Sequence, residues 1–254
     1  MKKISIPKLD VSKRQKIVVG INSLVATTQP AYSNHIQLFY RFGRSYPHID
    51  LCLVNPPRMS IDKMRNLCAE TAMQIEASHL LFIDDDVLIP HPFDCLSKLL
   101  ACKVPIAAAN VIIRGWPFNH MFFVHPKGDK GKLDFVKDIP KESKGKVMPV
   151  DAVGFSCCLI EVDLLKSLNK PYFITGPNNT EDIYFCMKAR DKFPDCKIVV
   201  DTSIECGHIL SAETIDESNL KNYRKYIKAQ FKPIDTSKDR ALPYYQMVKT
   251  CLNK

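Results

Sequence analysis

Three consecutive aspartates, Asp84, Asp85 and Asp86, directly follow the apolar run 79–83. An apolar run that stops at polar residues is typical of a central parallel strand whose C-terminal end carries chemistry. Adjacent carboxylates repel one another by about 1 kcal/mol or more per close pair at a protein surface. Mg²⁺ or Mn²⁺ would neutralise such a cluster, since these ions prefer oxygen ligands and commonly join one or two carboxylates to substrate phosphates. The sequence therefore predicts a metal site here; the alternative is an acidic turn that caps the next helix, for which one aspartate would suffice.

Two further segments could complete such a site. Thr180, Glu181 and Asp182 open a helical stretch, where a carboxylate could accept the proton of an attacking hydroxyl. Thr180 could equally cap that helix, with Glu181 and Asp182 favoured by its N-terminal dipole, and the two readings are compatible. Late in the chain, His208 follows a strand and Gly207, and imidazole can bind manganese beside oxygen ligands. A lone histidine is more often an ordinary surface or core residue.

The run 80–90 resembles the Asp-x-Asp signature of GT-A glycosyltransferases, particularly the family-2-like group. By that resemblance Asp86 holds the metal on the donor diphosphate, while Asp84 approaches the nucleoside and borders the metal. Asp85 is assigned to the nucleotide side as well. Arg65, followed by Asn66 on the helix before the strand, is similar to an arginine–asparagine pair often found in this group. We also expect Asn22, where the first strand gives way to a polar loop, on the nucleotide side.

The resemblance extends over about residues 16 to 210 and implies further roles. Glu181-Asp182 matches the Glu-Asp motif that supplies the catalytic base in inverting members, with Asp182 as the base and Glu181 as the next candidate. His208 would complete the metal shell. Segment 150–160 resembles the acceptor-side strand, in which Gly154 suits a close approach of the backbone to a ligand, or else a simple β-bulge.

The implied function is metal-dependent transfer of a sugar, with inversion, from a nucleoside diphosphate sugar to an acceptor hydroxyl. The alternatives are a sugar-phosphate nucleotidyltransferase and a catalytically inactive nucleotide-sugar- or anion-binding domain. Nucleotidyltransferases usually carry a glycine-rich basic loop near the first strand, whereas segment 20–24 has one glycine and no lysine. The joint presence of Asp84, Asp86, Asp182 and His208 counts against a decayed site. P-loop and His-Glu-x-x-His signatures are absent.

These residues need an α/β scaffold to meet. Hydrophobic patterning predicts strands at 17–21, 50–54, 79–83, 106–113, 150–162 and 197–200, and helices at 59–77, 92–102, 163–168, 180–192 and 220–231. We expect a polar loop at 22–34, a hairpin or loop at 127–146, and Trp116 either beside a sugar or in ordinary packing. The fold class is therefore α/β: a single GT-A sandwich with a mostly parallel central sheet. We divide the chain into an N-terminal extension (1–15), a catalytic domain (16–217) and a basic helical C-terminal segment (218–254) packed on the domain.

Composition limits the alternatives. The 254 residues are 46% hydrophobic and 25% charged, as in an ordinary globular protein, and no run approaches the roughly 20 apolar residues of a membrane span. No secretory signal is expected at the N-terminus. Ten cysteines without a Cys-x-x-Cys pair indicate buried free thiols, and hence a reducing, cytoplasmic location.

The basic C-terminal segment is the least explained part. It holds nine basic and two acidic residues, so it carries a net +7 of the +9 of the whole chain. Such a surface attracts phosphates, nucleic acid or an anionic membrane, although a basic helix that only aids solubility is as good a reading. The acceptor is left open as a glycan, a lipid-linked sugar or a polyanion such as nucleic acid. We favour an anionic acceptor or the donor diphosphate over membrane insertion.

Overall fold

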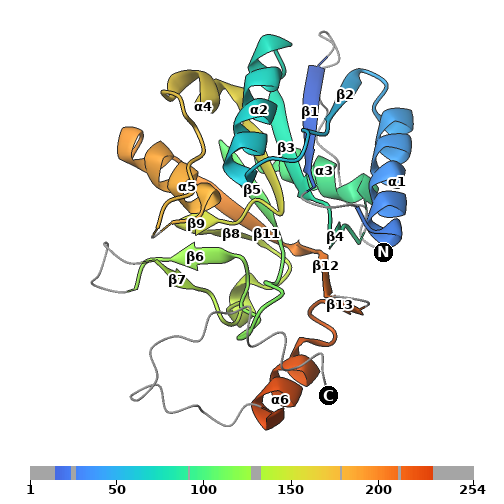
Figure 1. Cartoon of the computed structure of the whole chain (residues 1–254), viewed down its shortest axis with the longest axis vertical. Coiled ribbons are helices and arrows are strands. Elements are labelled where there is room, and N and C mark those ends of the chain that lie inside the picture. The colour runs from blue at the N-terminus through green and yellow to red at the C-terminus, as the bar shows by residue number, and fades with distance from the viewer. Residues whose placement is uncertain are drawn as a thin grey trace.

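The central sheet has seven strands, of which β10 and β8 run against the other five (Figure 1). A computed structural model describes residues 15–23, 27–90, 92–126, 133–177, 179–210 and 213–230. The mostly parallel sheet expected from the sequence is confirmed. In sheet order the strands are β2 (Ile49–Val54), β1 (Gln15–Asn22), β3 (His79–Asp84), β10 (Cys157–Glu161), β5 (Ile106–Asn110), β11 (Ile198–Glu205) and β8 (Val147–Pro149).

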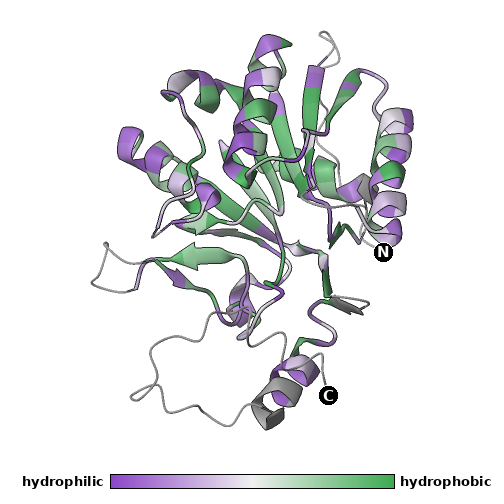
Figure 2. Cartoon of the chain, in the orientation of Figure 1, coloured by the Kyte–Doolittle hydropathy of each residue, from purple (hydrophilic) through white to green (hydrophobic). Residues whose placement is uncertain are grey.

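Helices cover both faces of this sheet and enclose two apolar cores. The first core lies under α2 (Ile61–Gln74), α4 (Val162–Ser167) and α5 (Glu181–Lys192), and the second under α1 (Gln29–Ser45) and α3 (Pro92–Ala101). Successive side chains of a strand point to opposite faces, so the β1 residue Val18 enters the first core while Ile17 and Val19 enter the second. The strands accordingly form the hydrophobic centre of the molecule in Figure 2.

Two small antiparallel sheets extend this body. One consists of β4 (Val87–Leu88), β12 (Gly207–Leu210) and β13 (Glu213–Ile215), and the other of β6 (Phe122–Val124), β7 (Asp134–Phe135) and β9 (Ala152–Val153). A short 3-10 helix, η1 (Lys141–Ser143), precedes β8, and α6 (Leu220–Gln230) lies beyond β13. In Figure 1, helix α6 lies at the opposite end of the molecule from α2, with β6 and β7 between them.

The expected polar loop at 22–34 is wrong in its second half, because α1 already begins at Gln29. The Thr28 hydroxyl accepts a bond from Ala31 N at 3.5 Å, and Pro30 suits the first helical turn. Asn34 looked like a loop residue, yet its amide bonds both the N–H and the carbonyl of Ile89. A polar residue with such tertiary partners is no sign of a loop.

The other predicted boundaries of strands and helices differ less from the observed ones. The strand expected at 106–113 ends at Asn110, and the run 150–162 forms two strands, β9 and β10, separated by Gly154, Phe155 and Ser156. The hairpin or loop expected at 127–146 is met only in part: β7 falls in this range, but its antiparallel partner β6 lies before it, and residues 127–132 lie outside the described part. Helix α6 also confirms the expected helix at 220–231; residues 1–14 and 231–254 of the terminal segments lie outside the described residues.

The cysteines match their expectation. Nine of them are free in the described residues, and all but Cys52 and Cys102 of these are buried; Cys251 lies outside that range. No helix among the described residues is long and apolar enough to cross a membrane.

Candidate active site

The acidic cluster lies at the edge of the sheet where β1, β3 and β5 end. Asp84 is the last residue of β3 and stands opposite Asn22, the last residue of β1. Because β10 runs the other way, it begins where these strands end, and Asp84 N donates to Ser156 O at 2.9 Å just before β10. Donor-side and acceptor-side segments of the sequence prediction therefore meet at one edge.

Both carboxylate oxygens of Asp84 have partners in the protein. Ser156 Oγ donates to Oδ2 at 2.6 Å, and Arg65 Nη2 lies 3.4 Å from Oδ1. Burial raises the pKa of Asp84, while the Arg65 charge and the Ser156 hydrogen bond offset part of that rise. Asp84 is thus a fixed, largely enclosed group of the site, held by the protein itself.

Arg65 joins the two carboxylate groups of the sequence prediction. It is 3% exposed, and its Nε lies 2.9 Å from Glu181 Oε1 as an ion pair, although that N–H does not point at the oxygen in hydrogen-bond geometry. Nη1 donates to Phe155 O at 3.1 Å, and the guanidinium lies 5.0 Å from the centre of the Phe82 ring. Burial raises the pKa of Glu181, and the Arg65 charge acts against this rise.

Asp86 is approached by two basic side chains. Strand β12 pairs with β4, and Ile209 N donates to Asp86 O at 2.9 Å, which brings His208 Nε2 to 3.3 Å from Asp86 Oδ1. Arg114 Nη1 lies 2.9 Å from Oδ2 and is half exposed. Burial would raise the pKa of Asp86, but the His208 hydrogen bond and the His208 and Arg114 charges outweigh it and lower this pKa.

The imidazole of His208 has a defined orientation. Its Nδ1 lies 2.6 Å from Ile112 O, and because a carbonyl can only accept, Nδ1 must carry the proton. In the doubly protonated ring, Nε2 then donates to Asp86 Oδ1, whereas in the neutral ring it presents its lone pair to that oxygen. A metal-binding histidine commonly donates its other N–H to a backbone carbonyl in this way. The pair fits a divalent cation held between Nε2 and the carboxylate.

Asp86 and His208 are the candidate ligand side chains that the described residues bring together here. Within the described ranges, no group of three or more His, Cys, Asp or Glu side chains is arranged to hold a metal ion. Asp86 and His208 would therefore need further oxygen ligands from outside the chain, as is usual for Mg²⁺ or Mn²⁺ sites completed by phosphates and water.

Asn22 and Asp85 lie beside Asp84. Asn22 is 4% exposed, and its Nδ2 has no hydrogen-bond partner among the described residues. A buried amide donor without an acceptor costs free energy, so this group is ready to bind a ligand oxygen. Burial raises the pKa of Asp85, with a hydrogen bond from Ser23 opposing the rise.

Asp182 sits at the start of α5, one residue after Glu181. Its Oδ1 accepts bonds from the Thr180 hydroxyl and from Ile183 N, so the side chain does serve the helix N-terminus. Thr180 makes no capping bond with its own side chain. A Cβ added to Gly154 would lie 2.7 Å from Met121 Cε and 3.4 Å from Asp182 Oδ2, so glycine is what allows the backbone to approach there.

Sequence reasoning missed three of these contacts. Ser156 and Arg114 were not placed on the aspartates, and the role of Ile112 O depends on a backbone atom, which no side-chain pattern reveals. In the sequence, only the opposite charges of Arg114 and Asp86 could have indicated that these two residues pair. Trp116, left open between sugar stacking and packing, is 48% exposed and lies edge-on to Phe118 with ring centres 6.3 Å apart.

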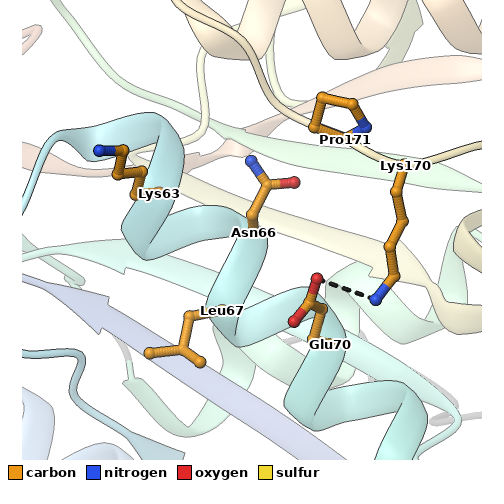
Figure 3. A pocket seen from close by; sticks show the side chains of 6 residues that line it. All are labelled: Lys63, Asn66, Leu67, Glu70, Lys170 and Pro171. Carbon is orange, nitrogen blue, oxygen red and sulfur yellow. Dashed lines mark hydrogen bonds and ion pairs between the residues drawn. The ribbon is translucent and has the colours of Figure 1, made fainter.

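A hollow of about 410 Å³ lies away from this site, on the outer side of α2 (Figure 3). Lys170 Nζ lies 2.9 Å from Glu70 Oε1 at its rim. Asn66 accepts from Tyr172 N at 2.8 Å and donates to Phe173 O at 2.7 Å, so its amide ties segment 171–173 to α2. The hollow shares no lining residue with the acidic cluster, and we do not assign the donor to it. It is lined by Lys63, Asn66, Leu67, Glu70, Lys170 and Pro171.

No family model and no curated protein matches this sequence. In structure, the chain is similar to A197 from STIV, with a TM-score of 0.56 at 15% identity over 80% of this chain and 91% of the other. Apo UDP-glucose pyrophosphorylase gives a TM-score of 0.44 at 11% identity, over 85% of this chain and 99% of that one. A glycosyltransferase involved in the glycosylation of the major capsid of PBCV-1 gives 0.40 at 12% identity, over 73% and 81%.

The likeness to A197 shows a shared fold, and the two lower scores carry no argument about function. The chain has the α/β architecture with a mostly parallel central sheet that the sequence predicts, and its acidic cluster lies at one end of that sheet.

Proposed function

We propose that this chain is a metal-dependent glycosyltransferase that transfers a sugar from a nucleoside diphosphate sugar to an acceptor hydroxyl. The observation that carries this proposal is the pair of Asp86 and His208. Because Ile112 O accepts from Nδ1, His208 Nε2 faces Asp86 Oδ1 at 3.3 Å, as a donor in the doubly protonated ring and as a lone pair in the neutral ring. Two acceptor atoms at this distance repel each other unless a proton or a metal cation lies between them.

Asp86 and His208 would hold Mn²⁺ or Mg²⁺, which supplies Lewis-acid stabilisation of the departing diphosphate. Arg114 is half exposed beside Asp86 and can reach the same phosphate oxygens. Asp84 would serve the nucleotide rather than the metal, since its oxygens are already engaged by Ser156 and Arg65.

The nucleotide side of the site is supported by Asn22. Its unpartnered Nδ2 lies at the end of β1, opposite Asp84, where it can donate to an oxygen of the nucleotide. Asp85 lies on the same edge and is only partly buried, so it remains reachable.

We assign the catalytic base to Asp182. Glu181 is less suited, because Arg65 pairs with it at 2.9 Å. Among the described residues, Asp182 accepts hydrogen bonds from Thr180 and Ile183 N on Oδ1, which leaves Oδ2, on the side of Gly154, to accept the proton of the acceptor hydroxyl. The attack would then proceed with inversion at the anomeric carbon.

The proposal is tested by incubating the purified chain with a panel of nucleoside diphosphate sugars, with and without Mn²⁺, and identifying the products. A transferase releases nucleoside diphosphate by slow hydrolysis even without its acceptor. A sugar-phosphate nucleotidyltransferase instead forms nucleoside triphosphate when pyrophosphate is added. Release of neither product, with no nucleotide-sugar binding in the presence of Mn²⁺, would overturn the proposal.

A further inference from the structure

The loop 112–118 provides two of the contacts that define the Asp86–His208 pair. Ile112 O fixes the His208 ring, and Arg114 pairs with Asp86. The loop is closed on itself by the bridge between Ile112 and His120 and by bonds such as Phe118 N to Gly115 O at 2.7 Å. Any element that holds this loop in place therefore also holds Ile112 O against the His208 ring and Arg114 beside Asp86.

Arg224 of α6 reaches the far end of this loop. Its Nη2 donates to Phe118 O at 3.1 Å and to Lys137 O at 2.8 Å, and its Nε donates to Pro117 O at 3.4 Å. Nη1 pairs with Asp138 at 3.1 Å. One guanidinium thus ties the loop to the segment after β7, which requires the several fixed donors that only arginine offers.

Apolar and ionic contacts support the same attachment. Ile112, Phe118, Ile215 and Leu220 form a separate buried cluster, so the loop and the start of the C-terminal segment share one small core. Glu217 Oε1 also lies 3.3 Å from the buried His120 Nε2, two residues beyond Phe118.

We propose that Arg224 is a positioning residue of the donor site: it holds loop 112–118 so that Ile112 O stays within hydrogen-bond distance of His208 Nδ1 and Arg114 reaches Asp86. From the sequence alone, we expected the basic C-terminal segment to serve an anionic acceptor or the donor diphosphate. The described beginning of that segment instead fastens the loop that borders the metal pair. The consequence for metal binding rests on the proposed function, whereas the effect on the loop and on the His208 ring does not.

The test uses the full chain without metal, as the wild type and as Arg224→Ala, Arg224→Lys and Asp138→Asn. Hydrogen exchange of the peptide that covers 112–118 reports how firmly the loop is held. ¹⁵N shifts of the His208 ring, assigned with His208→Gln, report which nitrogen carries the proton. Asp138→Asn is the matched control, because Asp138 is 86% exposed and its loss leaves the three carbonyl bonds of Arg224 in place.

We expect exchange in 112–118 to become at least about tenfold faster in Arg224→Ala, to rise less in Arg224→Lys, and to stay unchanged in Asp138→Asn. The ¹⁵N shift of His208 Nδ1 should change in Arg224→Ala, because its hydrogen bond to Ile112 O is weakened when the loop is released. The affinity for Mn²⁺, measured from the electron paramagnetic resonance signal of the free ion, should fall by roughly 10- to 100-fold. Losses of this size are typical when a group that orients a metal ligand is changed.

Wild-type exchange rates in Arg224→Ala, or faster exchange with an unaltered His208 ring, would overturn the proposal. If Arg224→Ala does not fold, hydrogen exchange of 112–118 and the ¹⁵N shifts of the His208 ring are measured in Arg224→Lys, and these two results decide whether the proposal holds. A wild-type chain that binds no Mn²⁺ would refute the proposed metal use, and the exchange and ring measurements would still judge the role of Arg224.

Discussion

His208 Nε2 and Asp86 Oδ1 face each other at 3.3 Å across the pairing of β12 with β4. Strand pairing sets the backbone positions, Ile112 O sets the ring, and Arg114 takes the second oxygen of the carboxylate. The site is thus arranged in advance by contacts that do not need a ligand, which limits the reorganisation that binding would require.

Asp86→Asn should abolish the gain in nucleotide-sugar affinity that Mn²⁺ provides, because an amide oxygen is a much poorer ligand than a carboxylate. The fold should persist, since Asp86 is partly exposed and lies outside the apolar cores. Titration calorimetry with and without Mn²⁺ measures the effect. Asp163→Asn, at an 87% exposed carboxylate, is the control. Unchanged Mn²⁺ dependence in Asp86→Asn would contradict the metal assignment.

Asp182→Asn should lower kcat by roughly 10²- to 10⁴-fold, because the amide cannot accept the proton of the acceptor. The Asn oxygen can still accept the bonds from Thr180 and Ile183 N, so the melting temperature should change little. Glu181→Gln serves as the comparison and should affect stability more than kcat, since it removes the ion pair with Arg65. The reverse pattern would transfer the base role to Glu181.

Arg65→Ala should lower the free energy of unfolding by about 3–5 kcal/mol, because it leaves buried carboxylates without their cation. Urea denaturation monitored by circular dichroism gives this value. Adding Glu181→Gln to Arg65→Ala removes one of the stranded charges and should restore part of the loss. A double variant no more stable than Arg65→Ala would mean that packing on Phe82, rather than charge, is what Arg65 supplies.

Stability should fall as the pH drops below about 6.5, the ordinary pKa of histidine. Burial lowers the pKa of His35, and nearby charges such as Asp85 and Asp86 only partly oppose this. The unfolded chain therefore binds the proton more readily, so the stabilisation is complete above pH 6.5 and is lost below it, by up to about 1.4 kcal/mol per pH unit for each proton. His35 Nε2 lies 2.9 Å from Val87 O and Nδ1 is buried without a partner in the described residues, so a second proton finds no acceptor.

His35→Gln keeps a donor for Val87 O and removes the titration, so it should flatten this pH profile. Chemical denaturation at pH 7.5, 6.5 and 5.5 measures the slope for both proteins. The wild type also contains His79 and His120, whose pKa values burial lowers as well, so some slope should remain. A slope identical to that of the wild type would exclude His35 as its source.

Gly20→Ala should destabilise the protein by about 1–3 kcal/mol, because the new Cβ would lie 2.9 Å from Cys68 Sγ and 3.1 Å from the buried Phe82 ring. Gly43→Ala in α1 is the matched control. Its Cβ would meet nothing within 4 Å, and alanine suits a helix better than glycine, so a gain of about 0.5–1 kcal/mol is expected. Thermal unfolding of both variants checks the contrast, which would fail if Gly20→Ala were as stable as the wild type.

The strands were readable from the sequence because their residues are continuously apolar, as in β3 and β10. Helix α1 was not, since its first half is polar and its amphipathic pattern depends on a few buried residues such as Leu38 and Phe42. Segment 150–162 looked continuous because its apolar residues continue through Phe155, while Gly154 actually ends β9 at a close contact with Met121.

The site was predictable where residue type alone indicates chemistry, as for Asp84–Asp86, and where a family pattern supplied the partner, as for His208. It was not predictable where function depends on pairing between distant groups. Nothing in the sequence links Arg114 to Asp86 or Glu217 to His120. Each contact depends on how the chain between its two residues folds back in space.

The order of strands in the sheet has a consequence for how the protein is made. Strands β1, β2 and β3 pair within the first third of the chain, whereas β10 must insert between β3 and β5 after both have been synthesised. Contacts between distant parts of a chain form slowly, because the entropy lost on closing the intervening loop comes first. During synthesis, the three aspartates emerge well before β10 and β12, which bring Ser156 and His208 beside them. The Asp86–His208 pair can therefore form only late in folding, and it cannot form before the ribosome has synthesised β12, which begins at Gly207.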